Sequence, residues 1–319
     1  MTGHEYAARG LPRTPVPTAL GPAPEIDWSA AELGALPSPC YVVDEGLLIR
    51  NLELLSAVAD AAGCKILLAQ KGFSMFSLYP LIGRYLAGAA ASSLFEARLA
   101  AEEMGKEVHI FAPAYREDEF DEIARFCGHI IFNSFGQWRR FRARAGGAEC
   151  GVRINPEYSE IKTALYDPCA KYSRLGVTIG SFLEETAAGG SVRTEADGRG
   201  GSDGLPELDG LSGLHFHTMC EQNSDTLART LAVVEEKFGR FLPAMKWVNF
   251  GGGHHITRPD YDIRTLVDCV RSFSARYGVQ VYLEPGEAIA LNTGFLISTV
   301  LDVADNGMKL AILDTSAAC

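Results

Sequence analysis

The sequence lacks several features that would place it in a specialised class of proteins. Its eight cysteines, among 319 residues, form no CxxC pair, which argues against a disulfide scaffold and a cysteine-based zinc framework and favours reduced thiols. No apolar run approaches the roughly 20 residues needed to cross a bilayer, and no charged-then-apolar signal segment opens the chain. We therefore expect a cytoplasmic protein with no membrane partner.

Positive charge is also scarce. Lysine and arginine together number 29, against 40 aspartates and glutamates, for a formal net charge of −11. This balance disfavours nucleic acid as a partner and is compatible with a cationic small molecule. Hydrophobic residues make up 47% of the chain, so the core can be that of one α/β barrel or of two smaller domains.

Two segments show little of the periodicity of regular structure. Residues 1–36 open with many proline, glycine and alanine residues, and we expect a flexible leader there. Residues 189–207 are glycine-rich and polar, as in a surface loop inserted between better patterned stretches.

Elsewhere, short β-branched runs alternate with longer amphipathic stretches. The expected strands are KILLAQ (65–70), GAAAS (88–92), EVHIFA (107–112), HIIFN (129–133), CGVRIN (150–155), GLHFH (213–217), KWVNF (246–250) and VQVYLE (279–284). The stretches 93–105 and 225–239 between them carry apolar residues at three- and four-residue spacing, as crossover helices do. Because eight such units close a parallel (β/α)8 barrel, we predict an α/β fold with a TIM-like barrel over residues 37–290.

Residues capable of chemistry follow these strands at the end where such barrels place their sites. They are Lys71 after the first strand, Arg153 at the fifth, His217 at the sixth, Gly251, Gly252 and Gly253 after the seventh, and Glu284 at the eighth. Taken singly, each has an ordinary explanation, such as a solvated lysine, a structural ion pair, a core histidine or a tight turn. Their shared position at one rim favours a common site.

These residue types suit pyridoxal 5'-phosphate. A lysine in a partly apolar site can hold this cofactor through a Schiff base. A GGG turn lets backbone amides approach a phosphate closely, because glycine has no Cβ and adopts positive φ freely. Glu284 could pair with the protonated pyridine nitrogen, His217 could stack on the ring, and Arg153 could position its polar edge.

The motifs around these residues resemble those of the pyridoxal-phosphate decarboxylases with the alanine-racemase-like, fold type III barrel. Within that group they resemble the carboxynorspermidine (carboxyspermidine) decarboxylase branch of polyamine biosynthesis. The resemblance runs from about Pro39 to Cys319 and includes the segments SPCYVVDE (38–45), LLAQKGF (67–73), GLHFHTMCEQN (213–223), WVNFGGGHHIT (247–257) and VYLEPGEA (281–288). It implies a homodimeric, pyridoxal-phosphate-dependent carboxy-lyase that converts carboxynorspermidine or carboxyspermidine to norspermidine or spermidine.

The resemblance also implies roles for single residues. Lys71 would carry the cofactor, His217 would stack on it, Gly251 to Gly253 would hold its phosphate, and Glu284 would meet its pyridine nitrogen. Ornithine and diaminopimelate decarboxylases usually have arginine three residues after that glutamate, where this chain has Glu287. The exchange removes a phosphate contact and adds a negative charge that could meet a distal amine of a polyamine. Asp314 is predicted to meet such an amine as well.

Residues 291–319, together with the strand at 38–44, resemble only the beginning of the C-terminal β domain of that family. We therefore expect a C-terminally truncated chain that lacks the cysteine and tyrosine which the domain adds to the site. Such a barrel would still bind cofactor, whereas its turnover of polyamine substrate is in question.

Two alternatives remain open. A noncatalytic barrel would bind pyridoxal phosphate without releasing carbon dioxide. A metal-dependent barrel hydrolase would use the HFH motif at 215–217 and the His254–His255 pair. Its usual HxH pair lies on the first strand, where this chain has Lys71, and we predict no metal at the site. The sequence does not decide between carboxynorspermidine and carboxyspermidine, or the stereochemistry at the substrate carbon.

Overall fold

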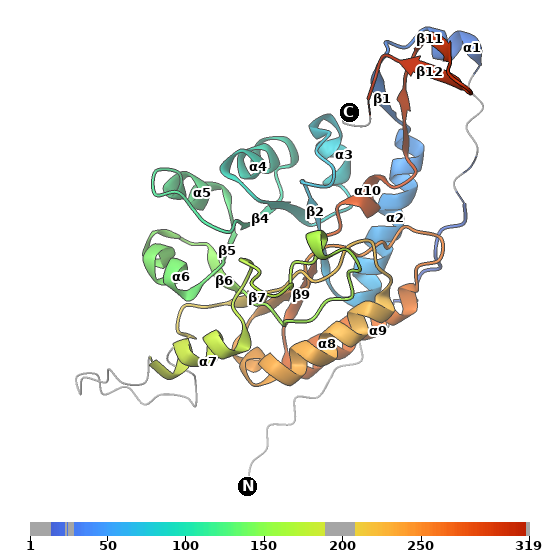
Figure 1. Ribbon diagram of the computed structural model, residues 1–319. Helices are drawn as coiled ribbons and strands as arrows, with labels where there is room; N and C mark the ends of the chain where they lie inside the picture. Colours follow the sequence, from blue (N-terminus) through green and yellow to red (C-terminus); the bar gives the residue numbers. More distant parts are fainter. Residues whose placement is uncertain (1–13, 23, 25–28, 189–207, 317–319) are drawn as a thin grey trace, which may run out of the picture.

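Eight parallel strands form a closed barrel in the computed structural model, which describes residues 14–22, 24, 29–188 and 208–316 (Figure 1). In barrel order they are β2 (Lys65–Ala69), β3 (Gly88–Ala91), β4 (Glu107–Phe111), β5 (His129–Phe132), β6 (Glu149–Arg153), β7 (Gly213–His215), β8 (Trp247–Asn249) and β9 (Gln280–Leu283). All eight predicted strands are confirmed. The predicted insert at 189–207 lies outside the described residues.

Helices cover the outside of the barrel (Figure 1). They are α2 (Glu45–Ala62), α3 (Tyr79–Ile82), α4 (Leu94–Leu99), α5 (Phe120–Phe126), α6 (Phe135–Phe141), α7 (Ile179–Ala188), α8 (Ser224–Phe238), α9 (Ile263–Tyr277) and α10 (Glu287–Ala290). The longest begins after Asp44, whose carboxylate accepts a hydrogen bond from the Leu47 amide at 2.9 Å, and ends at Gly63 with φ of 71°. None of the described helices is both long and apolar enough to cross a bilayer.

The interior of the barrel is filled at mid-height by an apolar layer of Trp247, Leu67, Ile131 and Tyr282. The Trp247 indole fits because two neighbouring strands carry glycine beside it. A Cβ on Gly151 would lie 2.3 Å from the indole, and one on Gly213 would lie 2.1 Å from it. This packed layer separates the polar groups at the two ends of the barrel.

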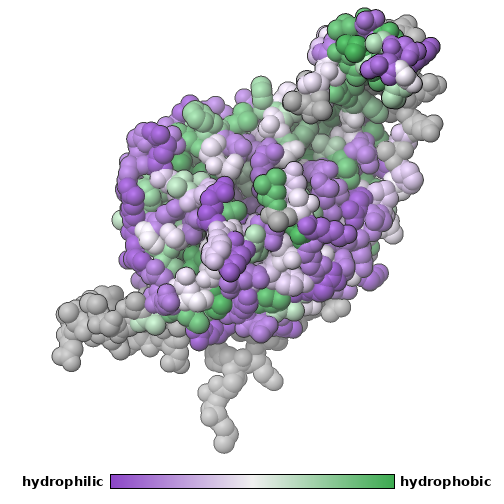
Figure 2. Space-filling view, in the orientation of Figure 1, coloured by the Kyte–Doolittle hydropathy of each residue, from purple (hydrophilic) through white to green (hydrophobic). Residues whose placement is uncertain are grey.

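Beyond the barrel, β1 (Cys40–Val43) pairs antiparallel with β10 (Gly294–Ile297). The next two strands, β11 (Val300–Asp305) and β12 (Lys309–Leu313), form a hairpin in which every residue is exposed. These elements, with the short helix α1 (Ala30–Gly34), lie away from the barrel, and apolar surface is visible there (Figures 1 and 2).

The described part of the predicted leader contacts the barrel. Arg50 donates hydrogen bonds to the carbonyl oxygens of Gly21 and Pro22 at 3.0 and 3.3 Å, and Arg271 donates one to the carbonyl of Thr14 at 3.0 Å. Val16 and Leu20 pack against the core. Residues 14–22 are thus held along the barrel by two arginines that the sequence pattern did not link to them.

Candidate functional site

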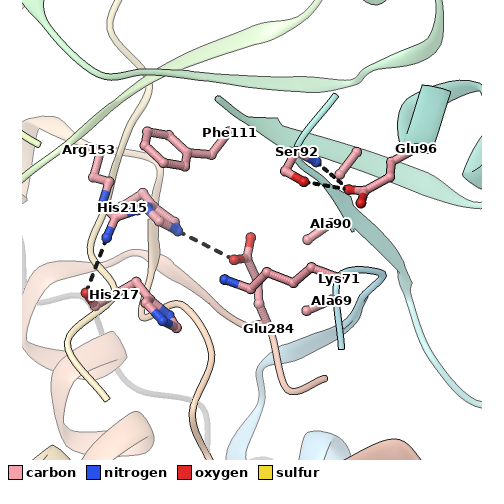
Figure 3. Close-up of a pocket in the computed structure, with 11 residues that line it drawn as sticks. Ala69, Lys71, Ala90, Ser92, Glu96, Phe111, Arg153, His215, His217 and Glu284 are labelled. Atoms are coloured by element: carbon pink, nitrogen blue, oxygen red, sulfur yellow. Dashed lines mark hydrogen bonds and ion pairs between the residues drawn. The ribbon is translucent and has the colours of Figure 1, made fainter. Parts of the chain in front are cut away.

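A pocket opens at the carboxyl-terminal ends of the barrel strands (Figure 3). It is lined by Ala69, Lys71, Ala90, Ala91, Ser92, Glu96, Phe111, Arg153, His215, His217 and Glu284. Four of these side chains, Lys71, Arg153, His217 and Glu284, are predicted site residues that come from four different strands. The fold therefore brings together at one rim residues that are far apart in the sequence.

Lys71 lies in the turn after β2, and its side chain reaches into the pocket toward Glu284 (Figure 3). The turn is held close to the EPG turn after β9, since a Cβ on Gly72 would lie 2.8 Å from the Cα of Gly286. Only glycine permits this backbone contact. Lys71 itself is exposed, so its amine is open to a ligand that enters the pocket.

Glu284 immediately follows β9, and its side chain is only 13% exposed. One carboxylate oxygen accepts a hydrogen bond from the Asn249 amide at 2.7 Å, and the other lies 3.4 Å from Nε2 of His215. Burial acts to raise the pKa of Glu284, but the interactions with His215, and then with His109 and Asn249, outweigh it and lower this pKa to about 2. The side chain is therefore a fixed carboxylate at neutral pH.

His217 lies two residues beyond β7 and is half-buried. Its Nδ1 accepts a hydrogen bond from the Gly252 amide at 2.9 Å, which places the proton of the neutral ring on Nε2. Burial, followed by the positive charges of Lys71 and Arg153, holds the pKa of His217 well below its usual range. A neutral imidazole of fixed orientation therefore faces the pocket.

Arg153 ends β6 and is 6% exposed. Its guanidinium lies 4.6 Å from the centroid of the Phe111 ring and donates a hydrogen bond of 3.3 Å to the carbonyl of His217. Burial lowers the pKa of Arg153 to about 10, so the group stays charged at neutral pH. Since a guanidinium offers five donors, most of this buried group remains available to anionic oxygens of a ligand.

The GGG turn after β8 requires glycine at each position. A Cβ would lie 2.4 Å from the Phe216 carbonyl oxygen at Gly251, 2.5 Å from that of Glu284 at Gly252, and 2.2 Å from that of Met219 at Gly253. Two of the three amides already donate within the protein, from Gly251 to the Asn249 side chain at 2.8 Å and from Gly252 to His217. The turn therefore contributes mainly space and the orientation of His217, and Gly253 carries the remaining amide.

Two predicted substrate residues lie outside the pocket lining. Glu287 is half exposed, and its carboxylate lies 3.1 Å from Nε2 of His255. Asp314 accepts hydrogen bonds from Ser38 at 2.6 Å, Ser298 at 2.8 Å and the Thr299 amide at 2.9 Å. These bonds link the residues before β1 to the turn after β10.

From the sequence, His215 was considered only as a possible metal ligand, and Asn249 and Phe111 were given no role. His215 contacts Glu284, Asn249 orients it, and Phe111 packs on Arg153. The HFH alternation places His215 on the same strand face as His217, which was a usable signal. No comparable pattern marks Asn249 or Phe111, because their role depends on the register between neighbouring strands.

No protein-family model matches the chain, but named relatives are similar to most of it. It is 42% identical over 280 residues to the carboxynorspermidine/carboxyspermidine decarboxylase of Campylobacter jejuni, a match that covers 88% of this chain and 68% of the relative. It is 41% identical over 288 residues to the carboxyaminopropylagmatine decarboxylase of a Synechocystis species, covering 89% of this chain and 69% of that protein.

Solved structures agree with these relatives. The crystal structure of Campylobacter jejuni carboxynorspermidine decarboxylase complexed with norspermidine superposes with a TM-score of 0.76 at 41% identity, over 88% of this chain and 68% of that one. A Helicobacter pylori diaminopimelate decarboxylase complexed with L-lysine, with a TM-score of 0.71 at 18% identity over 88% and 71% of the two chains, supports the fold alone. The barrel, its rim and the two relatives above 40% identity agree, and the chain belongs to the carboxynorspermidine/carboxyspermidine decarboxylase family.

Proposed function

We propose that this barrel binds pyridoxal 5'-phosphate in the Lys71 pocket and removes carbon dioxide from a carboxylated polyamine, carboxynorspermidine or carboxyspermidine. The observation that carries the proposal is the convergence of an exposed lysine, a fixed carboxylate and a neutral histidine on one pocket. Family membership, with relatives named as decarboxylases, supports the same reaction class.

The residues present fit this cofactor. The Lys71 amine is accessible, the buried Arg153 guanidinium has donors left for anionic oxygens, and the GGG turn leaves room that any Cβ would fill. A carboxylate whose pKa is about 2 can hold a protonated pyridine nitrogen without taking its proton. The donor set thus matches the aldehyde, the ring and the phosphate of the cofactor.

Each residue then has a defined task. When bound, pyridoxal phosphate supplies an electron sink for the pair released as the carboxylate leaves the substrate α-carbon. Lys71 would hold the aldehyde of the cofactor, and Glu284 would hold its protonated ring nitrogen. His217, whose ring is fixed by the Gly252 amide, would pack on the ring of the cofactor. Arg153 and the Gly253 amide would bind its anionic oxygens.

Glu287 is the proposed contact for a distal ammonium group of the substrate. Its backbone amide lies close to the turn that carries Lys71, since a Cβ on Gly72 would be 3.2 Å from it. Its carboxylate is 52% exposed and so open to a cationic ligand. Asp314 would have to give up three hydrogen bonds to play the same part, and its role stays a prediction.

The substrate is tested by measuring carbon dioxide release from carboxynorspermidine, carboxyspermidine and carboxyaminopropylagmatine, with added cofactor. The third compound is included because the Synechocystis relative, named for it, is almost as similar as the Campylobacter one. We expect turnover of the first two compounds, and faster turnover of the third would make the guanidino compound the substrate. Cofactor binding without release from any of them would favour the noncatalytic barrel.

Three further expectations accompany this proposal. The chain assembles as a homodimer, works in the cytoplasm, and divides into a leader, a barrel over residues 37–290 and a C-terminal β segment. Sedimentation of the purified chain tests the first, because a monomer at micromolar concentration would contradict it. Limited proteolysis tests the third, with cleavage expected near residues 36 and 291.

A further inference from the structure

A second polar cluster lies at the amino-terminal end of the barrel, opposite the Lys71 pocket. Glu107 and His109 point inward from alternate positions of β4, and His129 begins β5. His109 and His129 are directly paired in the register of these two strands. One coordinating atom from each of the three side chains lies within 4.8 Å of the other two.

Several atoms of this cluster are buried and have no hydrogen-bond partner in the described residues. They are Oε2 of Glu107, both ring nitrogens of His109, and Nδ1 of His129. A carboxylate oxygen is only an acceptor, and each neutral imidazole has one nitrogen with a free lone pair. Buried polar atoms normally have partners, and a cation would give one to Oε2 of Glu107 and to one lone pair on each ring.

The contacts of Glu107 hold its carboxylate close to the two rings. The ammonium of Lys65 contacts Oε1 of Glu107, and Oε2 lies 3.5 Å from Nε2 of His109. An ion bound by Oε2 would replace this long contact with a shorter one.

The surrounding charges are balanced. On β6, Glu149 has an oxygen 3.6 Å from Nε2 of His129, and Lys246, just before β8, lies 3.0 Å from Glu149. Each lysine here is thus paired with a glutamate, and Oε2 of Glu107, which lies 3.5 Å from Nε2 of His109, is the carboxylate oxygen of Glu107 that meets no lysine.

We propose that Glu107, His109 and His129 form a second site, for one divalent transition-metal ion such as zinc, at the amino-terminal end of the barrel. Two imidazoles and one carboxylate are a ligand set that binds such ions with further positions left for water. The apolar layer around Trp247 lies between this site and the pocket. The ion therefore lies outside the Lys71 pocket, and the role we propose for it is in the structure of the barrel.

Binding requires one ring to move. The two imidazoles are stacked, with centroids 3.8 Å apart and planes 17° apart, so their lone pairs lie in nearly parallel planes and do not both point at one ion. His109 is fully buried, whereas the side chain of His129 is 13% exposed. His129 is thus the ring that turns out of the stack, and the partly exposed Glu107 provides the path by which the ion enters.

The test uses the full chain loaded with pyridoxal phosphate and stripped of metal by a chelator. Titration with zinc, followed by calorimetry, should show one bound ion, and X-ray absorption at the zinc edge should show two imidazole ligands and no sulfur. The absence of zinc binding would overturn the proposal. Sulfur ligands would overturn it as well, because they would mean that a cysteine binds the zinc.

Variants assign the site. We expect His129→Gln and Glu107→Gln each to weaken zinc binding about tenfold or more and to lose the rise in melting temperature that zinc gives the parent chain. Cys220→Ser is the control, since Cys220 is the exposed thiol, and it should bind zinc like the parent. Equal zinc binding by all three variants would contradict the proposal. If a variant does not fold, the number of imidazole ligands that X-ray absorption finds in the parent chain decides whether the site exists.

Discussion

The two ends of the barrel use similar side chains in opposite ways. At the carboxyl-terminal end, Glu284 lies between Asn249 and His215, and His217 rests on the Gly252 amide. At the amino-terminal end, His109 and His129 are stacked on each other, and both nitrogens of His109 and Nδ1 of His129 are buried and make no hydrogen bond among the described residues. The first arrangement is ready for a ligand without rearrangement, whereas the second must change to bind one.

The largest expected effect comes from the lysine of the carboxyl-terminal end. Lys71→Ala should lower kcat by about a thousandfold or more, roughly 4 kcal/mol in the activation barrier, because Lys71 is the lysine that lines the pocket. Carbon dioxide release is the measurement. Lys246→Ala, at the opposite end and with a side chain that is 69% exposed, is the matched control and should keep full activity. Equal losses of kcat in the two variants would contradict the claim that catalysis takes place only at the carboxyl-terminal end.

The next effect concerns the ring nitrogen. Glu284→Gln keeps the shape of the side chain and removes the charge, so the cofactor should stay attached to Lys71 while kcat falls by about a hundredfold. Because the pKa of Glu284 is about 2, the parent carboxylate stays ionised down to that pH and loses its contribution only below it. The pH profile of the parent should therefore show no loss from this group between pH 5 and 8. An unchanged kcat in the variant would contradict the assignment.

A smaller effect is expected from filling the glycine turn. Gly252→Ala would bring a Cβ to 2.5 Å from the Glu284 carbonyl oxygen and 3.4 Å from the His217 ring, so the turn must shift and cofactor affinity should fall about tenfold. Gly128→Ala, before β5 at the other end, meets nothing within 4 Å and should bind cofactor normally. Fluorescence titration with pyridoxal phosphate distinguishes them, and equal affinities would show that the turn does not shape the site.

The amino-terminal end should add to the acid sensitivity that the buried histidines of the other end also give. The pKa of His129 is about 3 in the folded chain and about 6.5 when unfolded, so only the unfolded state binds a proton between these values. The free energy of unfolding should therefore be highest above pH 6.5 and fall as the pH drops toward 3. In metal-free protein, His129→Gln should flatten this slope in urea unfolding between pH 6.5 and 5. If the free energy of unfolding changes equally with pH in parent and variant, residues other than His129 cause the sensitivity to acid.

The smallest effect is expected at the edge of the pocket. Glu287→Gln should raise KM for the polyamine two- to fivefold, about 0.5–1 kcal/mol for an exposed ion pair, and leave kcat unchanged. Asp118→Asn, an exposed acid paired with Arg116, is the control for the loss of one negative charge. A change in kcat alone would argue for a role of Glu287 in the chemistry rather than in binding.

Much of the barrel could be predicted because alternation and spacing are local properties. Even GAAAS was identified as a strand despite the poor strand propensity of alanine, and the structure gives the reason for its small residues. A Cβ on Gly88 would lie 1.9 Å from the Glu107 carbonyl oxygen, so this strand needs small residues to approach β4. The rim positions of Lys71, Arg153, His217 and Glu284 followed from the strand ends.

What could not be predicted depends on contacts between strands. Asn249 orients Glu284 across the β8–β9 pair, and His129 meets His109 only because their strands pair in that register. Neither contact has a signature within a single segment. The hydrogen bond between Asp314 and Ser38, which links segments more than 250 residues apart, could not be predicted from the sequence either.

The central claim is that Lys71 carries the cofactor, and peptide mapping after reduction tests it most directly. The chain is incubated with pyridoxal phosphate, treated with borohydride, digested, and analysed by mass spectrometry. The account predicts one modified peptide, the one containing Lys71, and no modified peptide at this position in Lys71→Ala. Attachment at a different lysine, or none in folded protein saturated with cofactor, would contradict it.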